Sequence, residues 1–254
     1  MNRIDVTRFL ESLYPRHLAY DWDNVGLQVG SLNKPLKRVL VTLDVTRSVV
    51  KEAIEKRIDL LISHHPLIFQ PIQNILFDTP RGALIKHLVK HDIALFSMHT
   101  NFDRAEGGMN DILARKIGIK NAKLLDENDE IGRYGTIEPT TIKELISMVK
   151  EVLELDHVRL IGDEDREVSV VGISGGSGQQ HIVPAQRKGC DVFLTGDISY
   201  HQAIDALQMG FPLVDIGHTA EKVFVEAVFD VLKEQFPELD IAKSGIDTNP
   251  YQTL

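Results

Sequence analysis

The chain has 254 residues, enough for one large domain or two moderate ones that each bury a core. Hydrophobic residues make up 43% of it and charged residues 26%, an ordinary balance for a globular protein. The formal net charge of −9 argues against a general nucleic-acid surface or an anionic-membrane surface. It does not argue against an anionic small substrate, because bound cations can dominate a local field.

The sequence shows no sign of secretion or membrane insertion. Its first residues lack the apolar stretch of a signal peptide, and no apolar run approaches the roughly 18 residues of a membrane span. The single cysteine, Cys190, excludes an intrachain disulfide, and its apolar neighbours predict a small core side chain. We therefore expect a reducing, cytoplasmic compartment.

Helical and extended patterns alternate along the first half of the chain. Apolar spacing predicts a helix over residues 6–14, and the turn-rich segment 22–30 is expected to be a hairpin or a loop. The expected strands are residues 39–43, 58–62 and 93–97, and the expected helices are residues 46–56, 80–90 and 109–117. Such alternation is typical of βαβ units in a largely parallel sheet.

A polar, acidic stretch at residues 121–132 predicts a domain boundary. We expect a first α/β domain over residues 1–125, a second over residues 126–219, and a segment, 220–254, that packs back on the first. Within the second domain, the expected strands are residues 134–137, 158–161 and 168–173, and the expected helix is residues 141–153.

The glycine-rich run 174–178 lies between a predicted strand and a predicted helix. Backbone N–H groups at such a junction can face a phosphate, but the run completes neither a P-loop nor a dinucleotide pattern. A tight turn is therefore the favoured interpretation of Gly175-Gly176-Ser177-Gly178, and phosphate contact is the alternative.

The most informative stretch is Ser63-His64-His65-Pro66, which ends the apolar run 58–62. Ligands of α/β sheets bind at the carboxyl ends of the strands. Pro66 breaks the strand, so both imidazoles can serve one site, and neutral imidazole is the commonest metal ligand. The alternative is one core histidine and one solvated histidine.

The last third of the chain repeats this arrangement. Residues 190–197 align with residues 58–65, and residues 213–219 align with residues 94–100. His65 then corresponds to Asp197, and His99 corresponds to His218. We interpret this similarity as a weak internal duplication of a βαβ unit.

A carboxylate follows the second histidine of each copy, and all of these residues come after predicted strand ends. Three imidazoles and two carboxylates suit Zn²⁺, or alternatively Fe or Mn. Five ligands fit two ions about 3.5–4 Å apart. The predicted metal ligands are His64, His65, Asp103, His218 and Glu221.

Five further residues are candidates for roles around these ligands. Asp197 and His201, four residues apart, are proposed proton carriers, with an ordinary helix pair as the alternative. Arg104 and Lys222 each adjoin a predicted ligand and are expected to meet substrate phosphate oxygens. His99 is expected to be either a core residue behind the ligands or a substrate contact.

Five spaced motifs together resemble the NIF-three-like family, whose members are often labelled GTP cyclohydrolase I type 2 homologues. These motifs are Trp22-Asp23-Asn24-Val25-Gly26-Leu27, Ser63-His64-His65-Pro66, His99-Thr100-Asn101-Phe102-Asp103, Thr195-Gly196-Asp197 and Gly217-His218-Thr219-Ala220-Glu221. The resemblance runs from about residue 3 to the C-terminus. It implies two similar, intertwined, three-layer α/β domains and a toroidal homohexamer whose dinuclear metal sites face an inner cavity.

The resemblance also implies an activity. Metal-activated water would open the purine imidazole ring of GTP and release formate, using two divalent ions per subunit. The expected partners are other copies of the chain and a small, nucleotide-like substrate. The alternatives are a metal-dependent phosphoesterase acting on such a substrate and a non-enzymatic, metal-binding hexameric scaffold.

Overall fold

Two β-sheets, each with helices packed on it, organise the chain. The computed structural model describes residues 1–252. Met1–Ala105 and Phe224–Tyr251 form unit 1, and Glu106–Val223 form most of unit 2. The result is a mixed α/β fold with two sheets and many helices, as the alternating pattern of the sequence predicts.

Unit 1 contains a five-stranded sheet. Its strands are β1 (Gly26–Val29), β2 (Arg38–Thr42), β3 (Leu60–Ser63), β4 (Ala94–Ser97) and β11 (Asp240–Lys243). They lie in the order β1-β4-β3-β2-β11, and all are parallel except β1, which is antiparallel to β4. The helices are α1 (Arg3–Leu13), the 3-10 turn η1 (Arg16–Leu18), α2 (Arg47–Glu55), α3 (Pro80–Lys90), α4 (Thr100–Arg104) and nearly all of α9 (Val223–Gln235).

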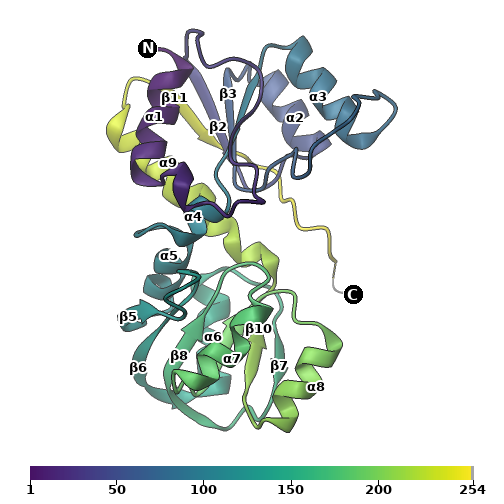
Figure 1. Cartoon of the computed structure of the whole chain (residues 1–254). Helices are drawn as coiled ribbons and strands as arrows, with labels where there is room; N and C mark the ends of the chain where they lie inside the picture. The colour runs from purple at the N-terminus through teal and green to yellow at the C-terminus, as the bar shows by residue number, and fades with distance from the viewer. Residues whose placement is uncertain (253–254) are drawn as a thin grey trace. The chain divides into compact units, whose positions relative to one another are not determined.

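Helices cover both faces of the unit 1 sheet. Figure 1 shows α1 and α9 on one side of it and α2 and α3 on the other. Leu40, Leu61 and Leu95, one from each central strand, pack in a single buried cluster with the apolar sides of α2 and α3. On the opposite face, the Phe9 ring of α1 lies edge-on to Phe236, which follows α9, at a centroid distance of 5.4 Å. Unit 1 therefore has three layers.

Unit 2 contains a six-stranded sheet in the order β5-β6-β8-β9-β10-β7. The strands are β5 (Lys120–Leu124), β6 (Arg133–Thr141), β7 (Arg159–Ile161), β8 (Glu167–Ile173), β9 (Val192–Thr195) and β10 (Leu213–Asp215). Strands β8, β9 and β10 are parallel, and the other three are antiparallel to their neighbours. The helices are α5 (Met109–Lys116), α6 (Ile142–Val152), α7 (Ile182–Arg187) and α8 (Tyr200–Gln208), with 3-10 turns η2 (Gln179–His181) and η3 (His218–Lys222).

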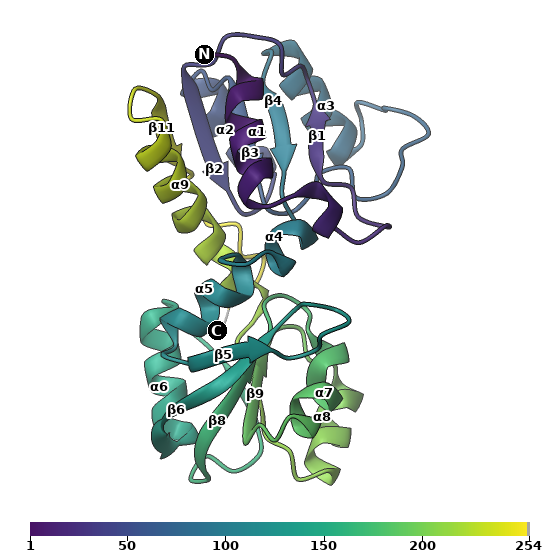
Figure 2. The ribbon, with the colours of Figure 1, turned by 60° about the vertical axis from the view of Figure 1, so that its left-hand side comes forward.

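The unit 2 sheet is also covered on both faces. Figure 2 shows α7 and α8 on one side of it and α5 and α6 on the other. Phe193 and Leu213 from the central strands pack with Ala185 of α7 and Ala206 of α8. Cys190 is buried in the same cluster, which confirms its expected core position.

Several details differ from the expectations. The segment 22–30 contains strand β1, which pairs with β4. The two units divide after Ala105, whereas the acidic composition placed the boundary near residue 125. The acidic residues instead form the turn between β5 and β6, both of which belong to unit 2. Among residues 1–252, no helix is long and apolar enough to cross a membrane.

Candidate metal centre

Strands β3 and β4 end side by side on serines. Ser63 and Ser97 are paired in register, and their hydroxyl oxygens lie 2.9 Å apart. The Ser63 hydroxyl also donates to the carbonyl oxygen of His65 at 2.9 Å, and Pro66 follows, so the strand stops here. The chain leaves the sheet at His64 and His65, at the carboxyl edge where α/β proteins bind ligands.

Three histidines of unit 1 meet at this edge. The ring centroids of His64 and His65 lie 4.8 Å apart, and the centroid of His99 lies 5.2 Å and 5.6 Å from them, respectively. Each ring offers a nitrogen within 4.8 Å of the other two. His64 is fully buried, whereas His65 and His99 are partly exposed. Imidazole nitrogens at this separation could hold a divalent ion.

The Nδ1 atom of each ring faces an oxygen that accepts a hydrogen bond. His64 Nδ1 lies 2.8 Å from Met98 O, His65 Nδ1 lies 2.7 Å from Asp44 Oδ1, and His99 Nδ1 lies 3.0 Å from Asp23 Oδ1. Such an acceptor keeps the proton on Nδ1 and leaves the lone pair of Nε2 for a metal. Metal-binding histidines are held in this way by carboxylates or backbone carbonyls.

Asp23 ties His99 to the helix that follows it. The buried Oδ2 atom of Asp23 accepts from the backbone N–H of Thr100 at 3.0 Å and from its hydroxyl at 2.5 Å. Burial of the Asp23 carboxyl raises its pKa. The interactions with His99 and the hydrogen bonds from Thr100 lower it by more, so the pKa of Asp23 lies below its ordinary value. An ionised Asp23 therefore orients the His99 ring.

Asp103 lies within α4, which begins directly after His99. The backbone N–H of Asp103 donates to the carbonyl oxygen of His99 at 3.1 Å. Its Oδ1 atom lies 3.6 Å from His64 Nε2. The helix therefore places a carboxylate beside the ring nitrogen that is oriented for a metal.

A histidine and a glutamate form a second pair of donors in unit 2. Gly217 follows β10 with a φ of 72°, a left-handed conformation that favours glycine, and η3 begins at the next residue. A 3-10 helix has three residues per turn, so residues i and i+3 share one side. His218 and Glu221 follow this spacing, and His218 Nε2 lies 3.1 Å from Glu221 Oε2. Glu221 is buried.

The hydrogen-bond arrangement of unit 1 recurs at His218. Its Nδ1 atom lies 2.7 Å from Oδ2 of Asp197, which comes two residues after β9. Asp197 has a φ of 55°, a left-handed conformation that Asp tolerates better than most residues. In this conformation the Asp197 carboxylate faces the imidazole ring of His218.

The glycine-rich run 174–178 packs against the His218–Glu221 pair. A Cβ atom on Gly176 would lie 2.5 Å from Glu221 Oε1 and 3.6 Å from His218 Nε2. The backbone N–H of Gly178 donates to the hydroxyl oxygen of Thr195 at 2.9 Å. The run is therefore a close-packed turn beside the pair, and the small size of Gly176 makes room for the glutamate.

An exposed aromatic surface adjoins His99. Trp22 is 58% exposed and stacks on Tyr20, with a centroid distance of 5.2 Å and an interplanar angle of 22°. Phe69 lies 5.6 Å from Trp22, and both rings approach His99 edge-on at 6.1–6.3 Å. Flat, partly exposed rings of this kind suit contact with a planar ligand.

The remaining predicted residues have identified contacts within their own units. Arg104 donates to the carbonyl oxygen of Leu18 at 2.7 Å, and Lys222 donates to that of Glu154 at 2.8 Å. His201 is exposed in the first turn of α8. Their roles toward a substrate or proton remain predictions.

The acceptors behind the histidine rings could not be found from sequence spacing. Asp44 and Asp23 lie 21 and 76 residues from their histidines, too far for any local pattern to connect them. Asp44 also accepts from the hydroxyl of Thr248 at 2.6 Å, which is a still more distant contact. Of these two, only Asp23 had a signal, because it belongs to the motif 22–27. Asp197, the acceptor behind His218, belongs to the motif 195–197. His99 was not predicted as a ligand, although it offers a nitrogen to the histidine group.

Comparison with known sequences identifies the family. The sequence model of Duf34/NIF3, or NGG1p interacting factor 3, matches residues 1–250. The chain belongs to the Duf34/NIF3 family. Within it, a relative in Streptococcus pneumoniae named GTP cyclohydrolase 1 type 2 homolog is 40% identical over 98% of each chain. The resemblance predicted from the five motifs is confirmed.

Solved structures agree with this Duf34/NIF3 assignment. A Bacillus cereus protein related to NIF3 matches with a TM-score of 0.94 and 28% identity, over 100% of this chain and 99% of that one. The Staphylococcus aureus protein SA1388 matches with a TM-score of 0.93 and 31% identity over the same shares. The donor set of this Duf34/NIF3 chain, imidazole nitrogens and carboxylate oxygens, fits Zn²⁺, Fe or Mn. Its histidine and acid groups could hold a metal ion.

Proposed function

We propose that this Duf34/NIF3 protein is a dinuclear-metal-dependent hydrolase of the GTP cyclohydrolase I type 2 kind, acting on a nucleotide-like substrate. The observation that carries the proposal is the common orientation of the histidines. His64, His65 and His218 each hold Nδ1 against an oxygen acceptor and keep Nε2 for a ligand. Two of the three acceptors are carboxylates, which commonly orient metal-binding histidines.

The proposed metal ligands are the five residues predicted from the sequence: His64, His65, Asp103, His218 and Glu221. The resemblance to the Duf34/NIF3 family supports their assignment to one dinuclear centre.

When bound, two such ions would supply Lewis-acid chemistry and a water nucleophile at neutral pH. The residues of the chain would bind the ions, orient the reacting groups and move protons around them. Asp197 holds the Nδ1 proton of His218, so its contribution runs through that ring. The exposed His201 is the proposed carrier of protons to and from solvent.

The substrate is proposed to lie across the aromatic surface of unit 1. Trp22 and Phe69 would stack on a purine base next to His99. Arg104 and Lys222 each adjoin a proposed ligand in the sequence, and we propose that they reach substrate phosphates by exchanging their present carbonyl contacts.

We also infer an internal duplication and a ring of six chains. The duplication is supported by element order, because helix-strand-strand-helix-strand-helix-strand runs both from α1 to β4 and from α6 to β10. In each unit, the first strand of this series is antiparallel to the last. The toroidal homohexamer rests on the family resemblance.

The test is product formation from GTP by metal-loaded protein, with and without chelator. We expect formate release by the wild-type chain and at least a tenfold lower rate in Asp103→Asn, equivalent to about 1.4 kcal/mol of barrier. Asp78→Asn, an exposed change of the same type in unit 1, should leave the rate unchanged. His201→Ala should keep its metals and lose part of the rate.

The products decide among the alternatives. Phosphate release without formate would favour the phosphoesterase. If protein with two bound metals released neither product above a metal-only blank, the cyclohydrolase proposal would fail, and the scaffold alternative would move ahead of it.

A further inference from the structure

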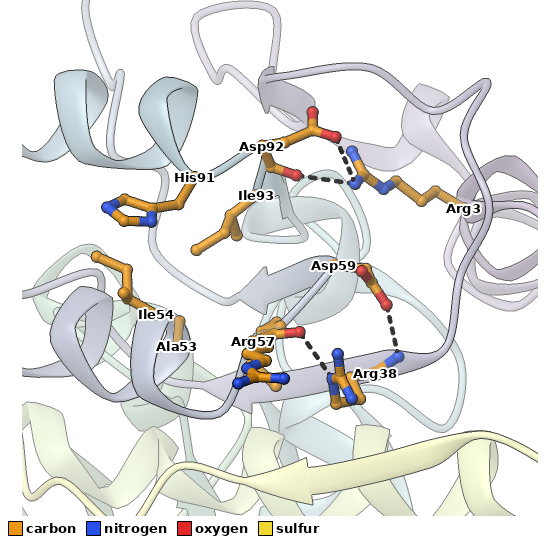
Figure 3. A pocket seen from close by; sticks show the side chains of 10 residues that line it. Arg3, Arg38, Ala53, Ile54, Arg57, Asp59, His91, Asp92 and Ile93 are labelled. Atoms are coloured by element: carbon orange, nitrogen blue, oxygen red, sulfur yellow. Dashed lines mark hydrogen bonds and ion pairs between the residues drawn. The ribbon is translucent and has the colours of Figure 1, made fainter.

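A hollow of about 230 Å³ lies at the edge of the unit 1 sheet where its parallel strands begin. Figure 3 shows the side chains that line it. Arg38 opens β2, Asp59 precedes β3 and Ile93 precedes β4, so these lining residues lie where the strands start. His64, in contrast, follows the end of β3. The strands therefore separate this pocket from the candidate metal centre.

Positive charge dominates the lining of the pocket. Three arginines contribute to it, against two carboxylates, in a chain whose net charge is −9. Both carboxylates are already engaged. Asp59 Oδ2 accepts from two backbone N–H groups, at 2.9 Å and 2.8 Å, and Asp92 Oδ1 lies 2.6 Å from Lys34 Nζ. Two guanidinium groups, those of Arg38 and Arg57, have no carboxylate partner among the ion pairs of residues 1–252.

Arg3 forms the buried side of this pocket. Its side chain is 3% exposed, and its Nη atoms donate to the carbonyl oxygens of Ser31 at 3.1 Å and Asp92 at 2.8 Å. In the part of the chain that the structure describes, its Nε atom is buried without a hydrogen-bond partner. A buried donor left in this state is costly.

Arg38 and Arg57 lie across the pocket from Arg3 (Figure 3). Arg38 donates its Nε proton to the carbonyl oxygen of Arg57 at 2.8 Å. This bond orients the Arg38 guanidinium and does not use its two Nη groups. Arg57 is exposed. The planar, always-charged guanidinium group matches the oxygens of phosphate in two-point hydrogen bonds.

We propose that this pocket binds a phosphate group, either as inorganic phosphate or as the end of a small phosphate ester. Its volume is below the roughly 300–1,000 Å³ of pockets for drug-sized ligands, which favours a small molecule. Ala53, Ile54 and Ile93 give it an apolar wall, against which a short carbon skeleton would pack. The phosphate would lie between the guanidinium groups.

The test is calorimetric titration of the full chain with inorganic phosphate and, separately, with glycerol 3-phosphate. We expect one saturable site per chain outside the metal centre. Arg57→Gln should raise the dissociation constant by at least about tenfold, the usual effect of losing a charge-assisted hydrogen bond. Because Arg57 is exposed, this variant is expected to fold, and Arg38→Gln provides a second, independent change in the pocket.

Two controls make the outcome decisive. Arg8→Gln removes the same charge from an exposed site on α1 and should leave the affinity unchanged. His65→Ala should also leave this binding unchanged, because the pocket lies at the other edge of the sheet. The proposal is overturned if neither probe binds, if Arg8→Gln weakens binding as much as Arg57→Gln, or if binding is lost in His65→Ala and kept in Arg57→Gln. If only one of the two probes binds saturably, that probe shows whether the pocket binds free phosphate or a phosphate ester.

Discussion

Asp44 positions the imidazole ring of His65 through a single hydrogen bond. Its carboxylate lies 2.7 Å from Nδ1 of His65 and so fixes the nitrogen that faces a metal. We predict that Asp44→Asn lowers metal affinity by about 10- to 100-fold, the usual effect of losing such a partner. Competition with a chelator of known affinity measures this change. Asp78→Asn, exposed in the loop before α3, is the control, and equal affinities in the two variants would contradict the assigned role.

Cys190 illustrates a residue whose chemistry is suppressed by its surroundings. Burial raises the pKa of its thiol, and the charge of Asp191 raises it further, to about 12. Almost no reactive thiolate is then present at neutral pH. We predict that iodoacetamide leaves the native protein unmodified for hours and labels it promptly in urea, as measured by intact mass. Rapid labelling of the native chain would show that the thiol is accessible and ionised.

At the scale of the elements, Gly176 connects the glycine-rich run to η3. Its φ of 56° and the 2.5 Å that would separate an added methyl group from Glu221 Oε1 are two distinct constraints. We predict that Gly176→Ala displaces the glutamate and lowers metal content. Gly189→Ala, with a φ of 78° and open space around it, isolates the backbone effect of about 1–2 kcal/mol. Urea unfolding and elemental analysis measure the two effects. Full metal content in Gly176→Ala would contradict the steric role.

The central strands and the helices beside them could be predicted because their side chains are buried in long apolar patterns. Strand β5 could not, since Lys120–Leu124 is mostly exposed and is held by its pairing with β6. The metal-ligand candidates were visible because histidines adjoin strand ends. Their outer partners were not, because the fold, rather than the local sequence, brings Asp44 to His65.

At the scale of the whole molecule, the family resemblance predicts a homohexamer, about six times the 28.5 kDa chain. The loop 66–79 supports an interface between copies, because Ile75, Leu76 and Phe77 are each about half exposed and form the kind of apolar surface that marks contact sites. Light scattering at micromolar concentration measures the mass. Leu76→Asp should lower it, whereas Asp78→Asn should not. A monomeric mass for the wild-type chain would contradict the homohexamer and the inner cavity that it would enclose.

We propose that the chain binds two metal ions through His64, His65, Asp103, His218 and Glu221. Elemental analysis of gently purified, metal-reconstituted protein tests it most directly. We predict two divalent ions per wild-type chain, fewer in both His65→Ala of unit 1 and His218→Ala of unit 2, and two in His157→Ala, an exposed histidine outside the donor set. A wild-type chain that stays metal-free after reconstitution, or a His218→Ala variant that keeps both ions, would contradict it.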